Sequence, residues 1–262
     1  MIKRFKENMA LLMEEISIPE YILWWMIRVC MILHIKHELR PDRDWIDYVL
    51  PYILFALTFI VFILRTVLPR KATLARLSFK TQTFISCMVF FGTFVGNFFD
   101  LYGVDSRIGA YHYDWILHAI SGVIITMLGY YFITAMNLGK PALSPKIATL
   151  CSVGFSFTLM VVWEMIEFFG DFLWGDMNQK YNWTVQEFDP FYPILSKGEP
   201  GPAQYPVFDT NIDMLLALLG TFLTAIILYI VLTVKDKKKQ TRQALEVDLT
   251  TQTSEATVAL DA

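Results

Sequence analysis

The sequence predicts an all-α protein that crosses a membrane about six times and keeps both termini in the cytoplasm. Three observations support this prediction. The chain of 262 residues is 55% hydrophobic and only 18% charged, whereas soluble domains carry about 25% charged residues. The apolar residues lie in long blocks, as membrane-spanning helices require, and Lys and Arg favour alternate connecting segments. The net charge of −3 gives no indication of a nucleic-acid partner.

The first three apolar blocks each approach the roughly 20 residues that cross a bilayer. They are 18–35 (IPEYILWWMIRVCMILHI), 48–68 (YVLPYILFALTFIVFILRTVL) and 83–100 (TFISCMVFFGTFVGNFFD). The triplet His34-x-x-His37-Glu38 ends the first block. We interpret it as a solvated helix end rather than as a set of metal ligands.

The last three blocks complete a transmembrane domain predicted to cover 18–234. They are 114–135, 147–173 (IATLCSVGFSFTLMVVWEMIEFFGDFL) and 210–234 (TNIDMLLALLGTFLTAIILYIVLTV). The Gly- and Pro-rich turn NLGKPALSP separates the first two of them. A long outer loop, 174–209, precedes the sixth block. Loops of this length are usually functional or disordered, and the aromatic residues in this one favour a packed lid.

Polar segments flank the predicted domain. Residues 1–17 are basic, but Glu14 and Glu15 interrupt their short apolar run and no A-x-A-like cleavage site follows. They predict a cytoplasmic lead-in that can form a surface amphipathic helix, rather than a cleaved signal. Residues 235–262 begin with KDKKKQTR and continue rich in Thr and acidic residues, which predicts a disordered cytoplasmic tail.

The distribution of Lys and Arg predicts the orientation. With the N-terminus inside, the inner segments hold fifteen of these residues and the outer segments six, and Arg28 lies within a span. The predicted protein is therefore a multi-pass membrane protein with its N- and C-termini inside.

Ionisable side chains gather at the predicted outer ends of the spans. Asp114 and His118 are four residues apart and so share one helix face, since each residue turns an α-helix by about 100°. Ser121 continues this face. The fifth span carries carboxylates at spacings of three and four: Glu164, Glu167 and Asp171.

Two more spans bring carboxylates to the same end. The sixth opens with Asp209 and Asp213, four residues apart. In the third, Asp100 follows Gly92-x-x-x-Gly96, a spacing of small residues at which helices approach closely. We therefore expect Asp100 to face the interior of the bundle.

Together these residues predict an acidic pocket that opens to the outer side. The inner parts of the last three spans, 119–135, 147–163 and 214–234, contain no Asp, Glu, Lys, Arg or His. Buried like charges cannot all ionise, so either several carboxyls share protons or a metal ion lies among them. One His in an oxygen-rich set suits Mg²⁺, Mn²⁺ or Ca²⁺, and Zn²⁺ if more nitrogen ligands join. The candidate ligands are Asp114, His118, Glu164, Glu167, Asp209 and Asp213.

Arg28 is the arginine in the predicted spans that could offset these charges, since Arg65 lies at the inner end of its span. Arg28 lies about 10 Å below the outer end of its span at 1.5 Å per residue. We expect it to pair with Glu164 or Glu167.

A structural interpretation stands beside the functional one. Polar side chains can simply hydrogen-bond helices together, and Asp100, Asp171 and Asp209 can be solvated residues at helix ends. Asp209 can also cap the N-terminus of its helix.

Three motifs resemble known families. They are Asp114-x-x-x-His118-x-x-x-Gly122, Glu164-x-x-Glu167 within VVWEMIEFFGD, and DTNIDMLLALLG at 209–220. Over about residues 85–232 the chain resembles the YjdF-type family of uncharacterised bacterial inner-membrane proteins. It is more distantly similar to VanZ-like proteins, which are linked to glycopeptide resistance. Where VanZ-like proteins have Gln, Asn and Lys, this chain has Glu167, Asp213 and Trp115, respectively. The resemblance implies a polytopic protein of the bacterial inner membrane.

Three functions remain open. In the first, the protein acts on or binds an envelope lipid or precursor at the outer leaflet. His118 and one of Glu164 or Glu167 then share general acid–base work, while Asp114, Asp209 and Asp213 orient them or hold a cation. The second is an ion- or proton-coupled transporter, and the third a structural or accessory membrane protein. The sequence decides neither catalysis nor the oligomeric state.

Overall fold

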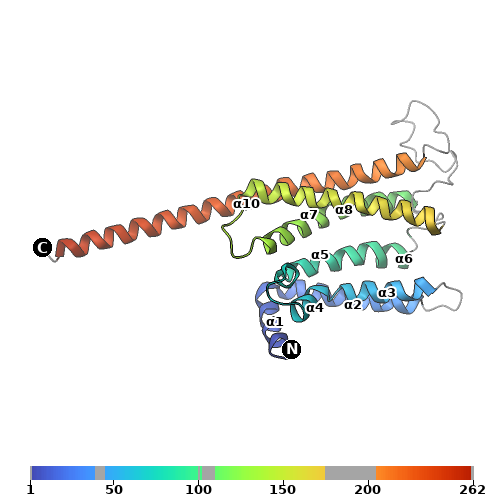
Figure 1. The fold of residues 1–262 in the computed structure, drawn as a ribbon, viewed down its shortest axis with the longest axis horizontal. Helices are drawn as coiled ribbons and strands as arrows, with labels where there is room; N and C mark the ends of the chain where they lie inside the picture. Colours follow the sequence, from blue (N-terminus) through green and yellow to red (C-terminus); the bar gives the residue numbers. More distant parts are fainter. Residues whose placement is uncertain (1, 39–44, 100, 102–109, 175–204, 261–262) are drawn as a thin grey trace.

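The polypeptide is a bundle of long helices that run side by side and alternate in direction (Figure 1). The computed structural model describes residues 2–38, 45–99, 101, 110–174 and 205–260, and these residues contain no strand. The all-α prediction is therefore confirmed.

Four helices in the described part of the chain are long and apolar enough to cross a membrane. They are α2 (Ile18–Glu38), α7 (Ala110–Met136), α8 (Pro145–Trp174) and α10 (Tyr205–Leu260). A fifth span arises if α3 (Trp45–Leu57) and α4 (Ile60–Val67), which meet at a bend of 68°, count as one. The described residues thus confirm a multi-pass protein with four or five candidate spans.

The predicted third span, 83–100, is helical but changes its helix type. It comprises α5 (Lys80–Val89), a π-helical segment η2 (Phe90–Val95) and α6 (Gly96–Phe98). These pieces run parallel to the other helices (Figure 1). Each piece alone is shorter than a membrane crossing, so a total of six spans stays a prediction.

The outward faces of the candidate spans are apolar. Only 22–33% of the most apolar stretch of each of the four spans is buried within the protein, and large apolar side chains are exposed along them. On α8 these include Val161, Met165 and Phe172, and on α10 Leu219 and Phe222. Such an apolar outer surface is stable in a lipid bilayer, where lipid chains cover it.

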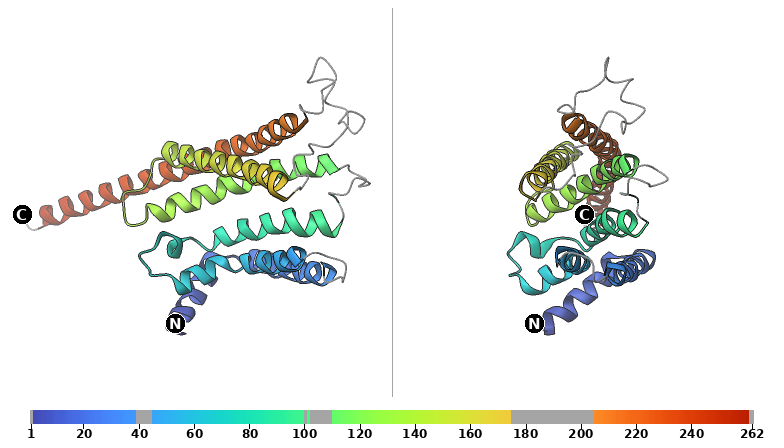
Figure 2. Two further views of the ribbon diagram at one scale, coloured as in Figure 1. Left: turned by 45° about the vertical axis from the view of Figure 1, so that its right-hand side comes forward. Right: turned by 90° about the vertical axis from the view of Figure 1, so that its right-hand side faces the viewer.

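The N-terminal helix and the distal part of α10 lie at the same end of the bundle (Figures 1 and 2). Helix α1 (Ile2–Glu15) lies across this end. It is held by a hydrogen bond from Asn8 Nδ2 to Thr66 Oγ1 (3.0 Å) and by Glu15, whose carboxylate accepts bonds from Ser78 Oγ (2.6 Å) and Phe79 N (2.8 Å). An even number of crossings, as the sequence predicts, brings both termini to one side.

The structure differs from the sequence-based expectation at two helix ends. His34 is only 1% exposed, so our interpretation of it as part of a solvated end is wrong, and α2 continues beyond it to Glu38. Helix α10 continues to Leu260, where the composition predicts disorder. Lys, Gln and Arg are good helix formers, and extending an existing helix avoids the cost of nucleation.

Helices α7 and α10 touch through their backbones at two glycines. A Cβ atom added to Gly122 would lie 2.0 Å from the carbonyl oxygen of Ala217, and one added to Gly220 would lie 2.1 Å from that of Ala119. By contrast, a Cβ added to Gly92 would meet no atom within 4 Å. Gly92 thus makes no close helix contact, and such contacts occur between α7 and α10.

We predict that Gly122→Ala destabilises the protein. The new methyl group collides with backbone atoms that cannot rotate away, and overpacking of this kind costs about 1–3 kcal/mol. Thermal unfolding of the full chain in detergent measures the effect. Gly154→Ala is the matched control, because a Cβ there meets no atom within 4 Å and Ala favours helix. Equal melting temperatures for the two variants would contradict the close contact.

Candidate functional site

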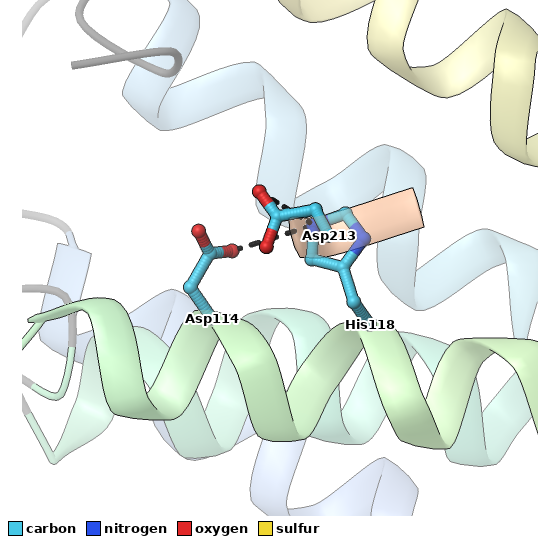
Figure 3. Close-up of side chains that lie close together, drawn as sticks. All are labelled: Asp114, His118 and Asp213. Atoms are coloured by element: carbon cyan, nitrogen blue, oxygen red, sulfur yellow. Dashed lines mark ion pairs between the residues drawn. The ribbon is translucent and has the colours of Figure 1, made fainter. Parts of the chain in front are cut away.

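The start of α7, the end of α8 and the start of α10 lie at the end of the bundle away from both termini (Figure 1). Asp114 and His118 project from successive turns of α7, and Asp213 approaches them from α10 (Figure 3). The structure thus brings together ionisable residues from two predicted spans that are about 100 positions apart in the sequence.

The imidazole of His118 is the centre of this cluster. Its Nε2 atom lies 3.5 Å from Asp114 Oδ1 and 3.8 Å from Asp213 Oδ2. The side chain of Asp213 is 1% exposed, that of His118 10% and that of Asp114 19%. One ligand atom from each of the three residues lies within 4.8 Å of the others. This spacing and donor set could hold a divalent cation.

Glu164 lies on the other side of the imidazole. Its Oε1 atom is 4.0 Å from His118 Nδ1, and its side chain is 9% exposed. The Thr210 side chain also hydrogen-bonds Glu164. Histidines that bind a metal usually direct their second ring nitrogen to a carboxylate, which fixes the tautomer. The 4.0 Å separation is longer than a hydrogen bond, so Glu164 would orient His118 in this way only on closer approach, while Nε2 faces the two aspartates.

Two of the other predicted acids interact electrostatically with members of this cluster. Glu167 is half-buried, accepts a hydrogen bond from Trp163 Nε1 (2.6 Å), and interacts electrostatically with His118. Asp209 is 4% exposed and interacts electrostatically with Glu164. These two acids therefore surround the cluster without belonging to the central three. Asp171, one turn beyond Glu167 on α8, is half-buried.

Arg28 lies elsewhere in the bundle. Its Nη2 atom donates to the carbonyl oxygen of Thr58 (2.7 Å), and its guanidinium carbon lies 3.8 Å from the centre of the Phe59 ring. The expected pair with Glu164 or Glu167 is thus replaced by contacts at the bend between α3 and α4. The free Thr58 carbonyl at this bend explains the position of Arg28, because a broken helix leaves acceptors that need a donor.

Two predictions lie outside the described residues. They concern Asp100 and most of the outer loop 174–209, of which residues 175–204 are not described. Their proposed roles, facing the bundle interior and covering the pocket, stay predictions.

Sequence reasoning overlooked several polar neighbours. Ser156 Oγ and Thr221 Oγ1 form a buried hydrogen bond of 2.9 Å between α8 and α10, and Thr221 Oγ1 also lies 3.4 Å from the carbonyl oxygen of Gly122. Thr221 is eight residues after Asp213 and Ser156 eight residues before Glu164, so these hydroxyls lie about two turns from the cluster. Their only signal in the sequence is a polar residue on the same helix face as Asp213 and Ala217.

Comparison with known proteins identifies a membrane protein family. The family model described as "Predicted membrane protein (DUF2238)" matches residues 20–234. No curated protein and no solved structure matches the chain. The matched region contains all the candidate spans up to the apolar part of α10, and it includes the Asp/His cluster.

We predict that the purified protein binds a divalent cation and that Asp213→Asn removes it. Loss of a ligand from a buried set of three leaves too few donors to hold the ion. Glu164→Gln should weaken the affinity by about 10–100-fold, the usual effect of losing an orienting carboxylate. Elemental analysis and metal titration of detergent-purified protein measure both effects. Asp171→Asn is the matched control, and equal metal content in all variants would contradict the site.

Proposed function

This chain belongs to the family of predicted membrane proteins described as DUF2238, and on that premise we propose that it acts within the membrane on a lipid or lipid-linked precursor of the bacterial cell envelope. The observation that carries the proposal is the convergence of Asp114, His118 and Asp213 within 4.8 Å at one end of the bundle. Ionisable residues inside a membrane are costly and usually serve a function.

The proposed chemistry assigns a separate role to each group. A divalent cation held by Asp114, His118 and Asp213 would polarise a phosphoryl or acyl oxygen, or activate a water molecule. Glu164 orients His118 through Nδ1. Glu167 lies beside the cluster and is only half-buried, so it can exchange a proton with a bound substrate as general acid or base.

The surroundings of Glu167 favour a lipid substrate. Its partner Trp163 is 49% exposed, and the adjacent residues Met165, Ile166 and Phe168 are also exposed. This face of α8 is apolar and would contact lipid. A lipid headgroup could therefore reach Glu167 sideways from the bilayer. The Lys and Arg distribution supports the outer leaflet of the inner membrane as the location.

We predict that Glu167→Gln lowers the rate of lipid conversion by about 10²–10⁴-fold, the usual contribution of general acid–base catalysis, and that His118→Ala abolishes it. The test incubates the purified full chain with host envelope lipids and a divalent cation, and follows the lipids by mass spectrometry. Asp171→Asn, which removes a carboxylate one turn further along α8 and keeps Glu167, is the control. The proposal fails if the wild type neither converts nor retains any lipid, or if folded His118→Ala stays active.

Proton-coupled transport is a second candidate, favoured by the buried Ser156–Thr221 hydrogen bond below the cluster. Hydroxyls of this kind could continue a proton path from His118 toward the opposite end. Transport predicts proton uptake by proteoliposomes that falls in Thr221→Val, a nearly isosteric variant, with metal content unchanged. If uptake by the wild type equals that of empty liposomes, transport is excluded, and an effect of Thr221→Val on stability alone indicates a structural role.

A further inference from the structure

A second site lies at the opposite end of the bundle from the Asp/His cluster. A cavity of about 1110 Å³ opens between α1, η1 (Thr73–Arg76) and the last turns of α7. Its α7 wall, from Tyr131 to Ala135, is at the other end of this helix from Asp114. The cavity is therefore independent of the function proposed above.

Among the ionisable side chains that line this cavity, basic ones outnumber acidic ones. Five of them contribute: Arg4, Arg65, Arg70, Arg76 and Lys80. The lining also contains three glutamates, two of which are already engaged. Glu7 pairs with Arg70 at 2.5 Å, and Glu15 pairs with Arg65 (3.4 Å) while accepting bonds from Ser78 and Phe79. The remaining charge of the cavity is positive and suits an anion.

Two arginines in the cavity are held in place by hydrogen bonds to backbone carbonyl groups. Arg76 is held by hydrogen bonds from its Nη2 to the carbonyl oxygen of Lys71 (2.6 Å) and from its Nη1 to that of Leu138 (3.4 Å). Arg65 donates through Nη1 to the carbonyl oxygen of Leu77 (2.6 Å), but among the described residues its buried Nε has no acceptor. Guanidinium groups held in this way match the oxygen atoms of a phosphate group.

Helix α1 indicates that the cavity lies at the boundary between membrane and water. Ile2, Phe5, Met9 and Met13 are all exposed and recur at spacings of three and four, so they form one apolar stripe along the helix. A helix with an exposed apolar stripe and basic residues beside it is typical of one that lies in a membrane interface. Phosphate groups of lipids occupy the same level.

We propose that this cavity binds a phosphate group, with Arg65, Arg76 and Lys80 as its contacts. Basic pockets at the cytoplasmic ends of transmembrane helices bind anionic lipid headgroups, and a soluble phosphate compound would use the same donors.

The test measures thermal unfolding of the full chain in a non-ionic detergent with added phosphatidylglycerol, phosphatidylcholine or inorganic phosphate. A ligand that binds the folded state raises the melting temperature in a saturable way. We expect a rise with phosphatidylglycerol and none with phosphatidylcholine. Arg76→Gln combined with Lys80→Gln should weaken the apparent affinity by about tenfold, through the loss of charge-assisted hydrogen bonds.

Matched variants keep this test decisive. Lys71→Gln combined with Lys140→Gln removes the same charge from positions that do not line the cavity and should leave binding unchanged. Lys80→Gln alone, at an exposed position, replaces the double variant if the latter does not fold. Saturable stabilisation by inorganic phosphate would identify a soluble ligand as the source of the phosphate. Equal effects of the two lipids without any effect of phosphate, or equal affinities of cavity and control variants, would overturn the proposal.

Discussion

The contact between the backbones of α7 and α10 determines where the chemical groups of this protein meet. Gly122 faces Ala217, and Gly220 faces Ala119, at distances that leave no room for a Cβ atom at either glycine. His118 lies one turn before Gly122, and Asp213 one turn before Ala217. Because the axes converge at the glycines, the side chains one turn nearer the bundle end must lie against each other. Packing of small residues between spans thus positions the cluster.

The cluster is costly to bury, and its arrangement reduces that cost. Two aspartates face one ring nitrogen of His118 and a glutamate faces the other. A single imidazole can compensate only part of the negative charge of three carboxylates, and an uncompensated buried charge strongly destabilises a protein. A bound cation would supply the missing charge without any change of backbone. A bound cation would therefore both stabilise the fold and take part in the proposed chemistry.

Helix periodicity predicted much of this arrangement, because residues that share a helix face must approach the same neighbour. That rule placed Asp114 with His118 and located Asp213 on the facing side of its helix. It could not predict the partner of Arg28, because that partner is a carbonyl group exposed by the bend after Leu57. It also could not distinguish Gly92 from Gly122, since small residues permit a close contact but only the packing of a second helix creates one.

The three helices that carry the site are joined to the N-terminal helices next to the cluster. Helices α7, α8 and α10 pack on one another, and α5 connects them to α2 and α3. At η2 the chain adopts a π-helix, which shifts the usual pairing of its carbonyl groups, and the Tyr113 hydroxyl donates a hydrogen bond to the carbonyl oxygen of Phe91. Tyr113 immediately precedes Asp114. The π-helical segment, a local departure from regular helix, thereby fixes the first turn of α7 and with it one of the three groups around the proposed cation.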